Sequence, residues 1–374
     1  MSINIVHPIS KMFDIVVSNP PYINISKIKS KNYLKDKFKV SGSIDLGILF
    51  YRIAYDYLHE NGVVCYLTSN KWLGSLSGAW VRKFVKEHFR IIRIVNTYRV
   101  RLFEAHMEVC IVLAIKEGGA KNYDIEVRML RPRVGYRWSA VRQEGYRISS
   151  SQLTDEIWHL EPPEIMSIYH IIQKTGTPIS KWSLRITTGI RLREYASAIT
   201  TSPQEGTEWV GIIKGRDIQK YFHKQPSMWL PRSVMPAISN SDNRYRIIFS
   251  KMNAKTGFVL AEPYIYGDET TYILELVYYN EEVLYYLLGI LNSCFFDWCF
   301  RKFYAGGGIE GEVKLYAIRK FPVPTIEVNY RLVYSIIEAV KLIYNSNLVD
   351  YSNTIDNLVL ELYSLKAEYL YIYS

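Results

Sequence analysis

Apolar positions between Phe13 and Lys116 form short continuous runs that alternate with helically spaced sets. The run Phe13 to Ser18 (FDIVVS) predicts a buried strand, and the spacing along Ile44 to His59 predicts a helix closed by Asn61-Gly62. Further strands are predicted at Val63 to Thr68, Ile91 to Asn96 and Glu108 to Lys116, with a helix around Ala79 to His88. Strands that alternate with helices are typical of an α/β domain. We expect this domain to end at Gly118-Gly119.

The pattern changes beyond residue 119. Strand-like pieces become short and are separated by turns, and a helical stretch at Glu281 to Phe300 interrupts them. The tail is helical, with an apolar face formed by Ile355, Leu358, Val359, Leu362 and Leu365. The sequence therefore predicts an α/β domain at 1–118, an α+β domain at 119–330 and a helical tail at 331–374.

The first predicted strand runs into Asn19-Pro20-Pro21-Tyr22, where two prolines prevent further strand pairing or a helix. Ligands of open α/β sheets bind outside the carboxyl ends of the strands. One chemistry that such a site suits is reaction at the exocyclic amine of an adenine. That amine is a poor nucleophile, because its lone pair is delocalised into the ring. The Asn19 amide oxygen and the Pro20 carbonyl would accept its two hydrogens, held in place by the diproline, and Tyr22 would stack on a flipped base. The competing interpretation is a rigid turn with a packed tyrosine.

The charge is uneven along the chain. Lys and Arg number 46 against 36 Asp and Glu, a net charge of +10, and the surplus lies in the first 230 residues. Positions 27–39 hold six Lys with one acid, and positions 128–147 hold six Arg with one acid. Solvated loops often carry such clusters, but two of them favour a polyanionic partner, most simply nucleic acid. The residues that we assign to DNA binding are Lys27, Lys29, Lys31, Lys35, Lys37, Lys39, Arg131, Arg133 and Arg137.

The remaining composition narrows the class of protein. A chain with 48% hydrophobic and 22% charged residues fits neither a disordered nor an integral membrane protein. Four cysteines in this length indicate a reducing compartment, and the start of the chain lacks the pattern of a secretion signal, so we expect a cytoplasmic protein. The spacing of Cys294 and Cys299 matches no common zinc pattern, and we predict no metal.

The strand followed by Asn19-Pro20-Pro21-Tyr22 resembles the catalytic motif of the gamma-class adenine-specific DNA methyltransferases that carry a TaqI-type C-terminal target-recognition domain. Such enzymes belong to type II and type IIG restriction-modification systems. Later segments are similar to the same family in the same order: Asp45 to Phe50, Leu58 to Val64, Leu67 to Leu73, Thr188 to Ile190, Ile213 to Ile218, Leu287 to Phe300, Ala317 to Pro324 and Ile355 to Leu365.

The resemblance implies an incomplete Rossmann-like methyltransferase sheet at 1–118, a target-recognition domain at 119–330, duplex DNA as partner and S-adenosylmethionine as cofactor. It implies catalytic roles for Asn19, Pro20, Pro21 and Tyr22. Phe50 stands where the family places an aromatic ring beside the adenine of the cofactor. Phe103, in Arg101 to Ala105, stands where the family packs a ring against the flipped base.

One departure from the family concerns the glycine-rich cofactor loop, which precedes the catalytic motif in the gamma order. Only twelve residues precede Phe13, and residues 331–374 contain no glycine. Gly306-Gly307-Gly308 follow a helix-like segment and lack the preceding strand and following acid that such a loop needs. We therefore expect the cofactor pocket to be incomplete in this chain, and a second chain to supply the missing loop.

Two functions follow from this. The first is a DNA adenine methyltransferase in a split or truncated form, and the alternative is a DNA-binding specificity subunit that performs no chemistry. Methylation of an RNA base or of a protein glutamine is a weaker interpretation, because the long basic and aromatic C-terminal region would then have no function. A fused nuclease needs an acidic cluster followed by Lys. The nearest approach, Asp124 to Arg128, ends in Arg, so we do not expect a nuclease.

Overall fold

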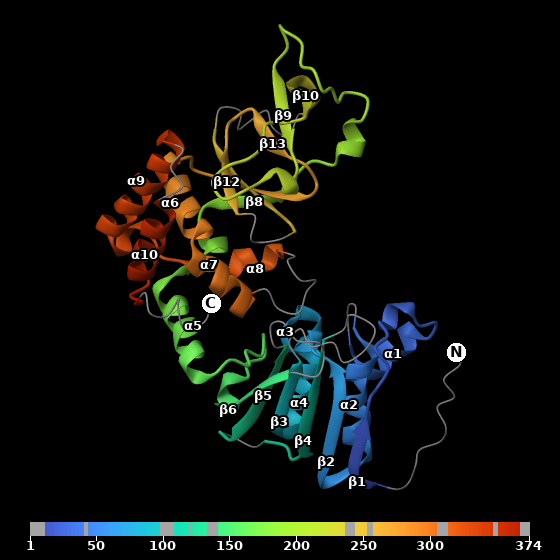
Figure 1. The fold of residues 1–374 in the computed structure, drawn as a ribbon. Helices are drawn as coiled ribbons and strands as arrows, with labels where there is room; N and C mark the ends of the chain where they lie inside the picture. Colours follow the sequence, from blue (N-terminus) through green and yellow to red (C-terminus); the bar gives the residue numbers. More distant parts are fainter. Residues whose placement is uncertain are drawn as a thin grey trace. The chain divides into compact units, whose positions relative to one another are not determined.

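A computed structural model provides the fold of the chain (Figure 1). It describes residues 12–40, 44–97, 108–119, 122–132, 141–235, 244–252, 257–304, 313–346 and 351–366. The chain divides into two compact units that meet in the sequence at Ser167 and Ile168. Each unit has its own sheet structure and is described by itself.

The first unit is built on a six-stranded mixed sheet in the order β1-β2-β4-β3-β5-β6. Its strands are β1 (Phe13–Ser18), β2 (Leu58–Ser69), β3 (Phe89–Thr97), β4 (Val109–Lys116), β5 (Asp124–Pro132) and β6 (Val141–Ser149). β1 pairs in parallel with β2 and β3 pairs in parallel with β5, whereas β4 is antiparallel to both β2 and β3. The predicted strand before the diproline is confirmed, but the prediction that it is buried is wrong: β1 is an edge strand, and Phe13, Ile15 and Val17 are exposed.

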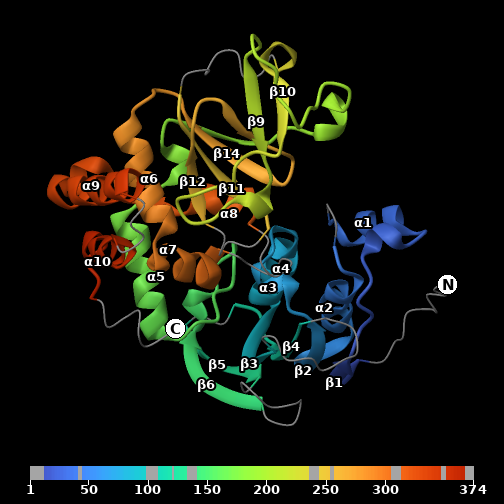
Figure 2. The same cartoon turned by 45° about the horizontal axis from the view of Figure 1, so that its top comes forward.

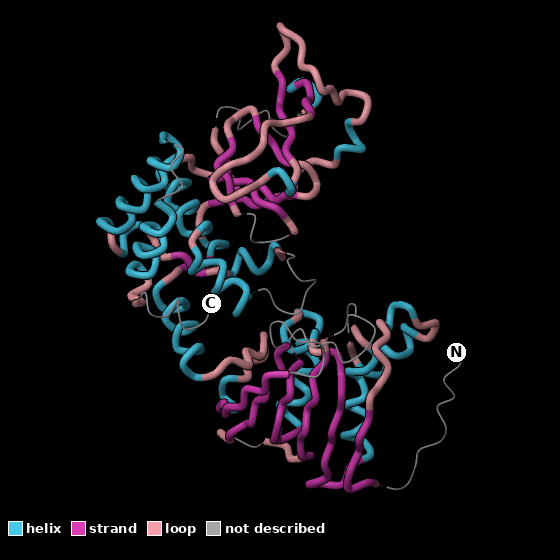
Figure 3. The backbone as a smooth tube through the Cα atoms, in the orientation of Figure 1, coloured by secondary structure: helices cyan, strands magenta, loops and turns pink. Residues whose placement is uncertain are grey.

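Helices α2 (Leu46–Tyr57) and α4 (Ala79–His88) pack against one face of this sheet (Figure 3). β4 shows the asymmetry that results: Val112 and Ala114 are buried on one face, whereas Ile111, Leu113 and Ile115 alternate with them and are half-exposed. The short helices α1 (Lys31–Phe38) and α3 (Lys71–Gly74) lie at the end of the sheet where β1 and β2 finish (Figure 1). The α/β prediction for this part of the chain is confirmed.

The prediction that Asn61-Gly62 closes the helix along Ile44 to His59 is wrong. α2 ends at Tyr57, and β2 begins at once with Leu58. Asn61 has a φ of 65°, and the register between β1 and β2 shifts between Phe13 and Ile15. Asn61 therefore belongs to an irregularity within the strand, where a residue that tolerates positive φ is needed.

The sheet continues beyond Gly118-Gly119, where we expected the domain to end. β5 and β6 extend it, and the first compact unit runs to Ser167. Ile125 and Val127 on β5 are fully buried and complete the core of this unit. The alternation of apolar and charged residues along β5 is itself a strand pattern, so the error lies in reading Gly118-Gly119 as the end of the domain.

The second unit contains three small sheets, ordered β12-β11-β14-β8, β10-β9-β13 and β15-β7. The strands are β7 (Thr177–Pro178), β8 (Leu184–Thr188), β9 (Trp209–Ile213), β10 (Met228–Pro231), β11 (Arg246–Ser250), β12 (Phe258–Ala261), β13 (Ile265–Gly267), β14 (Thr271–Leu276) and β15 (Pro322–Val323). The helices are α5 (Pro163–Thr175), which enters the unit from the first, α6 (Glu281–Asn292), α7 (Cys294–Cys299), α8 (Leu315–Lys320), α9 (Tyr330–Ser346) and α10 (Ser352–Leu362). The predicted α+β character and helical tail are confirmed.

The predicted helix at 281–300 is two helices, because Ser293 ends α6 and caps α7 by accepting from the Phe296 N–H at 3.0 Å. α6 packs against α9, and α10 packs against both (Figure 2). In the part of the chain that the structure describes, no single helix is long and apolar enough to cross a membrane. The bent pair Glu281–Asn292 and Cys294–Tyr304 passes that test of length and composition when taken together.

Candidate active site

Polar side chains lie together at the end of the first sheet where β1, β2 and β3 finish. We call this end of the sheet the polar edge. Asn19 follows β1, Asn70 and Lys71 follow β2, and Asn96 lies near the end of β3. The antiparallel β4 starts at this edge, so Glu108, which precedes it, belongs to the same group. This is the edge at which open α/β sheets bind their ligands.

The four residues of the diproline motif are held in distinct environments. Asn19 and Pro21 are exposed, Pro20 is buried and Tyr22 is half-buried. The Tyr22 hydroxyl donates to the Asn19 Oδ1 at 2.7 Å and also lies 3.2 Å from the carbonyl oxygen of Leu67. A single phenolic proton serves these two acceptors. The structure thus brings Asn19 and Tyr22 together, as the sequence predicts.

The phenol of Tyr22 stays protonated at neutral pH. Its pKa is raised to about 12, mainly by burial and to a smaller extent by the nearby Cys110 and Asp45. A protonated phenol is a hydrogen-bond donor. Tyr22 can therefore orient the Asn19 amide over the whole physiological range of pH.

The start of α2 fixes the backbone of the motif. The Asp45 carboxylate caps the helix by accepting from the Gly47 N–H at 3.0 Å. Gly47 lies against the diproline: a Cβ at this position would be 3.3 Å from the Pro21 carbonyl oxygen. The Leu46 N–H donates to the Ile23 carbonyl oxygen at 2.7 Å, so the chain that leaves Tyr22 is tied to the same helix.

Asp45 is a member of the site that we did not predict. Burial raises the pKa of its carboxyl, while the Gly47 N–H and the charge of Lys71 lower that pKa. The charge of Asp45 also acts on Tyr22. An acidic residue placed directly before the apolar run of the second helix is a typical N-cap and could have been recognised in the sequence.

A second unpredicted group is a hydrogen-bonded set at the end of β2. The Asn70 amide nitrogen donates to Asn96 Oδ1 and to Glu108 Oε2, both at 3.1 Å. Asn70 and Asn96 lie just after or at the end of a predicted strand, and Glu108 is the first residue of the next predicted strand. These positions could have identified the set in the sequence. The set links three strand ends and leaves further acceptor positions on the Glu108 carboxylate.

Phe50 lies in the middle of α2 and is half-buried against the core of the first unit. Its carbonyl oxygen accepts from the Tyr66 hydroxyl at 3.3 Å, and the rings of Tyr51 and Trp72 lie 5.8 Å apart between centroids nearby in the same core. The assignment of Phe50 to a place beside the adenine of S-adenosylmethionine stays a prediction.

Three predicted site residues, Phe103, Arg133 and Arg137, lie outside the described residues. Gly306-Gly307-Gly308 lie outside them as well. Thr97, at the end of β3, and Val109, at the start of β4, are joined: the Thr97 hydroxyl donates to the Val109 carbonyl oxygen at 2.8 Å and accepts from the Val109 N–H at 3.0 Å.

The predicted lysine cluster lies on α1 and its flanks. Lys35 is half-buried and the other five, Lys27, Lys29, Lys31, Lys37 and Lys39, are exposed. The single acid of the cluster, Asp36, lies 3.0 Å from Lys39 with both side chains more than four-fifths exposed, so this ion pair is weak. α1 lies at the same end of the sheet as the diproline motif (Figure 1).

The arginine cluster is more strongly paired than its sequence suggests. Arg128 lies 2.5 Å from Glu126, which also pairs with Arg93 at 2.5 Å, and these partners lower the pKa of the Glu126 carboxyl. Arg131 lies opposite Arg142 in the β5–β6 register. Arg128 is thus engaged by an acid of its own strand.

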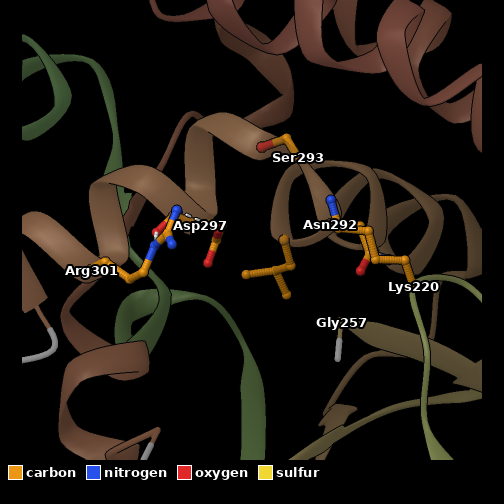
Figure 4. Close-up of a pocket in the computed structure, with 7 residues that line it drawn as sticks. Lys220, Gly257, Asn292, Ser293, Asp297 and Arg301 are labelled. Carbon is orange, nitrogen blue, oxygen red and sulfur yellow. Dashed lines mark hydrogen bonds and ion pairs between the residues drawn. The ribbon is translucent and has the colours of Figure 1, made fainter. Parts of the chain in front are cut away.

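A separate pocket of about 290 Å³ lies in the second unit (Figure 4). It is lined by Lys220, Gly257, Leu291, Asn292, Ser293, Asp297 and Arg301. Arg301 and Asp297 pair with each other at 2.7 Å on one wall of the pocket. The pocket contains none of the residues at the polar edge of the first unit, and at this volume it is at the small end of ligand sites.

Among the residues that the structure describes, no group of three or more His, Cys, Asp or Glu side chains is placed to hold a metal ion.

Residues 5–103, which include the diproline motif and most of the polar edge, match the Eco57I restriction-modification methylase family. Among curated proteins, the type II methyltransferase M.BstVI of Geobacillus stearothermophilus is 30% identical over 118 residues, or 31% of this chain and 21% of that protein. The type II methyltransferase M.BanIII of Aneurinibacillus aneurinilyticus is 27% identical over 106 residues, or 28% of this chain and 18% of that protein. The chain thus spans about one fifth of the length of these relatives.

Among solved structures, the type IIL restriction-modification enzyme MmeI, determined in complex with DNA, resembles this chain with a TM-score of 0.61. The match covers 94% of this chain and 55% of MmeI at 13% sequence identity. At this identity the likeness concerns the fold alone. The α/β sheet, the β-rich region and the helical tail are thus a fold also found in a restriction-modification enzyme.

Proposed function

We propose that this chain carries the catalytic edge and the DNA-recognition region of a site-specific DNA adenine methyltransferase from a restriction-modification system. It would belong to the gamma class with a TaqI-type recognition domain, and it would modify the exocyclic amine of a flipped adenine. The observation that carries the proposal is the exposed Asn19 amide at the carboxyl end of β1, oriented by the Tyr22 hydroxyl at 2.7 Å. The family match of residues 5–103 supports it.

The chemistry asked of Asn19 is to accept hydrogen bonds from the adenine amine. An amide oxygen has two lone pairs, so the oxygen that accepts from Tyr22 has room for one N–H of the base. The Pro20 carbonyl would accept the second N–H. These contacts strengthen as the nitrogen becomes nucleophilic, and since the acceptors are held in advance, little reorganisation is needed.

Tyr22 has a second role in this proposal. Its half-buried ring, with the hydroxyl directed at Asn19 and Leu67, offers one face to a flipped base. Stacking of a base on an aromatic side chain contributes about 1 to 3 kcal/mol. Phe103 would pack against the same base.

S-adenosylmethionine would supply the methyl group, and the described residues form one side of its site. We propose that a second chain supplies the glycine-rich loop and the rest of the pocket. The open edge of β1 supports this: Ile15 and Val17 are 63% and 70% exposed, although they belong to a strand of the central sheet. A parallel sheet is normally covered on both faces, and an added strand and helix would cover these side chains.

The alternative function is a DNA-binding specificity subunit without catalysis. The incomplete cofactor site favours it. In this case the Asn19–Tyr22 pair would be a rigid turn, and the DNA contacts of Lys27, Lys29, Lys31, Lys35, Lys37, Lys39, Arg131, Arg133 and Arg137 would be the function.

The two functions differ in whether the bound DNA acquires a methylated base. The chain is mixed with the polypeptide encoded immediately upstream, S-adenosylmethionine and duplex DNA, and the nucleosides are then analysed by mass spectrometry. The proposal predicts N6-methyladenine at a short defined sequence. DNA that is bound but carries no methylated base would favour the specificity subunit, and methylcytosine would exclude the adenine assignment.

A further inference from the structure

Four strands of the second unit end at the same place. Ile213 at the end of β9 pairs with Gly267 at the end of the parallel β13. Thr188 of β8 and Ser250 of β11 pair with the first residues of β14. The Asp268 N–H, directly after β13, donates to the Ile213 carbonyl oxygen at 3.0 Å and joins the two groups of strands.

Cationic side chains follow these strand ends. Arg191 and Arg193 follow β8, Lys214 and Arg216 follow β9, and Lys251 follows β11. We call these five residues the strand-end surface. The three arginines are exposed and the two lysines are half-buried. Sequence patterns do not reveal the group, because its members come from three separate segments.

The acids nearby are engaged in holding the loops. The Asp217 carboxylate accepts from the Lys214 N–H at 2.8 Å, and the Glu269 carboxylate accepts from the Leu192 N–H at 3.0 Å. That backbone contact is the main cause that lowers the pKa of Glu269, and the charges of Arg193 and Lys214 lower the pKa further. The Glu269 carboxylate therefore stays ionised at neutral pH, and both carboxylates fix the turns that present the arginines.

Two glycines allow the loops to pack closely. A Cβ at Gly189 would lie 2.1 Å from the Asp268 carbonyl oxygen, and a Cβ at Gly215 would lie 2.5 Å from the Ser250 Oγ. Side chains do not fit at these distances. The turns that carry Arg193 and Arg216 are thus anchored to the strands, and little backbone freedom is lost when they bind a ligand.

We propose that the strand-end surface is a second contact for duplex DNA, in which Arg193 and Arg216 bind backbone phosphates. The inference rests on the proposed DNA-modifying function and names residues of the second unit that take part in it. Neither arginine forms an ion pair with any residue that the structure describes. A planar guanidinium matches a phosphate through two parallel hydrogen bonds, so exposed arginines on anchored turns suit this ligand.

The test measures how the affinity of the full chain for a duplex depends on salt. Each phosphate contact contributes about 0.9 to the slope of log K against log salt concentration. The double variant Arg193→Gln with Arg216→Gln should therefore lower the slope by about 1.8. The control replaces Lys174 on α5 and Arg331 on α9 by Gln, which removes the same charge from exposed helix positions of the same unit.

The control should leave the slope nearly unchanged, and both double variants should unfold at the wild-type temperature. An unchanged slope for the arginine variant overturns the inference while the proposed function stands. An equal fall in both variants also overturns it, because net charge alone would then explain the effect. A wild-type chain that binds no duplex overturns the inference and the proposed function together.

Discussion

The two units present polar groups at the ends of their strands in different ways. In the first unit, most of these groups are uncharged: the Asn19 amide and the Tyr22 hydroxyl form a pair, and Asn70 joins Asn96 to the Glu108 carboxylate. In the second unit, exposed arginines follow the strand ends, and acids hold the turns beneath them. Oriented neutral acceptors suit a reacting amine, whereas exposed cations suit a phosphate backbone.

This difference separates catalysis from affinity. A hydrogen bond that matters in the transition state depends on the orientation of one group, so its loss lowers the rate without weakening binding. Phosphate contacts are spread over many cations, so the loss of one or two changes affinity and its salt dependence. Variants of Asn19 should therefore change mainly the rate, whereas variants of exposed cations in either unit should change affinity and its salt dependence.

The largest effect is expected for Asn19→Ala in the reconstituted enzyme. Methyl transfer should fall by a factor of about 10² to 10³, the usual result when one oriented hydrogen-bonding group is lost. Binding of duplex DNA in a gel-shift assay should stay close to wild type. Asn32→Ala, an exposed position on α1, is the matched control and should retain full activity. An Asn19→Ala enzyme with most of the wild-type rate would exclude the proposed mechanism.

Tyr22 sharpens the comparison, because two substitutions separate its ring from its hydroxyl. Tyr22→Ala removes a stacking platform of about 1 to 3 kcal/mol and should weaken capture of the flipped base as well as the rate. Tyr22→Phe keeps the ring and removes the donor to Asn19, so it should lower the rate alone and by a smaller factor. The measurements are kcat and KM for methyl transfer. Equal losses in both variants would assign the whole effect to the hydroxyl.

The lysine cluster on α1 extends the test to affinity in the first unit. Replacing Lys31, Lys37 and Lys39 by Gln should lower the slope of log K against log salt by up to about 2.7, at 0.9 per phosphate contact. The rate at saturating DNA should change little. If the slope stays at the wild-type value, the DNA does not pass over α1, and binding belongs to other surfaces.

The smallest effect concerns pH and a half-buried pair in the second unit. His223 Nε2 lies 3.0 Å from Glu262 Oε2, and burial lowers the pKa of His223 while the Glu262 carboxylate raises it, with a net rise above its usual value of 6.5. The pair thus stabilises the fold fully below about pH 6.5 and less as pH rises through the raised pKa. The melting temperature should fall slightly between pH 6 and pH 8.5, and Glu262→Gln should flatten this dependence. A steeper dependence in Glu262→Gln would contradict the assignment.

The sequence predicted the elements that carry regular patterns. β1, α4 and the helical tail follow apolar periodicity, and Asn19 and Tyr22 were placed by the short motif after a strand. β5 and β6 are assigned to the wrong domain because a Gly-Gly turn within a sheet looks the same in the sequence as one between domains. The close of α2 is misplaced because Asn61 accepts a positive φ within a strand as readily as after a helix.

The polar sets were harder to predict than the motif. Asn70, Asn96 and Glu108 are brought together by strand order, and β4 lies between β2 and β3 although it follows both in sequence. The strand-end surface depends in the same way on pairing among short strands. Sequence spacing carries no record of such neighbours, since they form when the sheet does.

The central claim is that the polar edge of the first unit becomes a methyltransferase when the rest of the cofactor pocket is added. The direct measurement is transfer of tritiated methyl groups from S-adenosylmethionine to duplex DNA, with this chain, with the polypeptide encoded upstream, and with both together. We predict incorporation into adenine with both and none with either alone. Transfer by this chain alone, or no transfer by the combined chains that still bind DNA, would contradict the account.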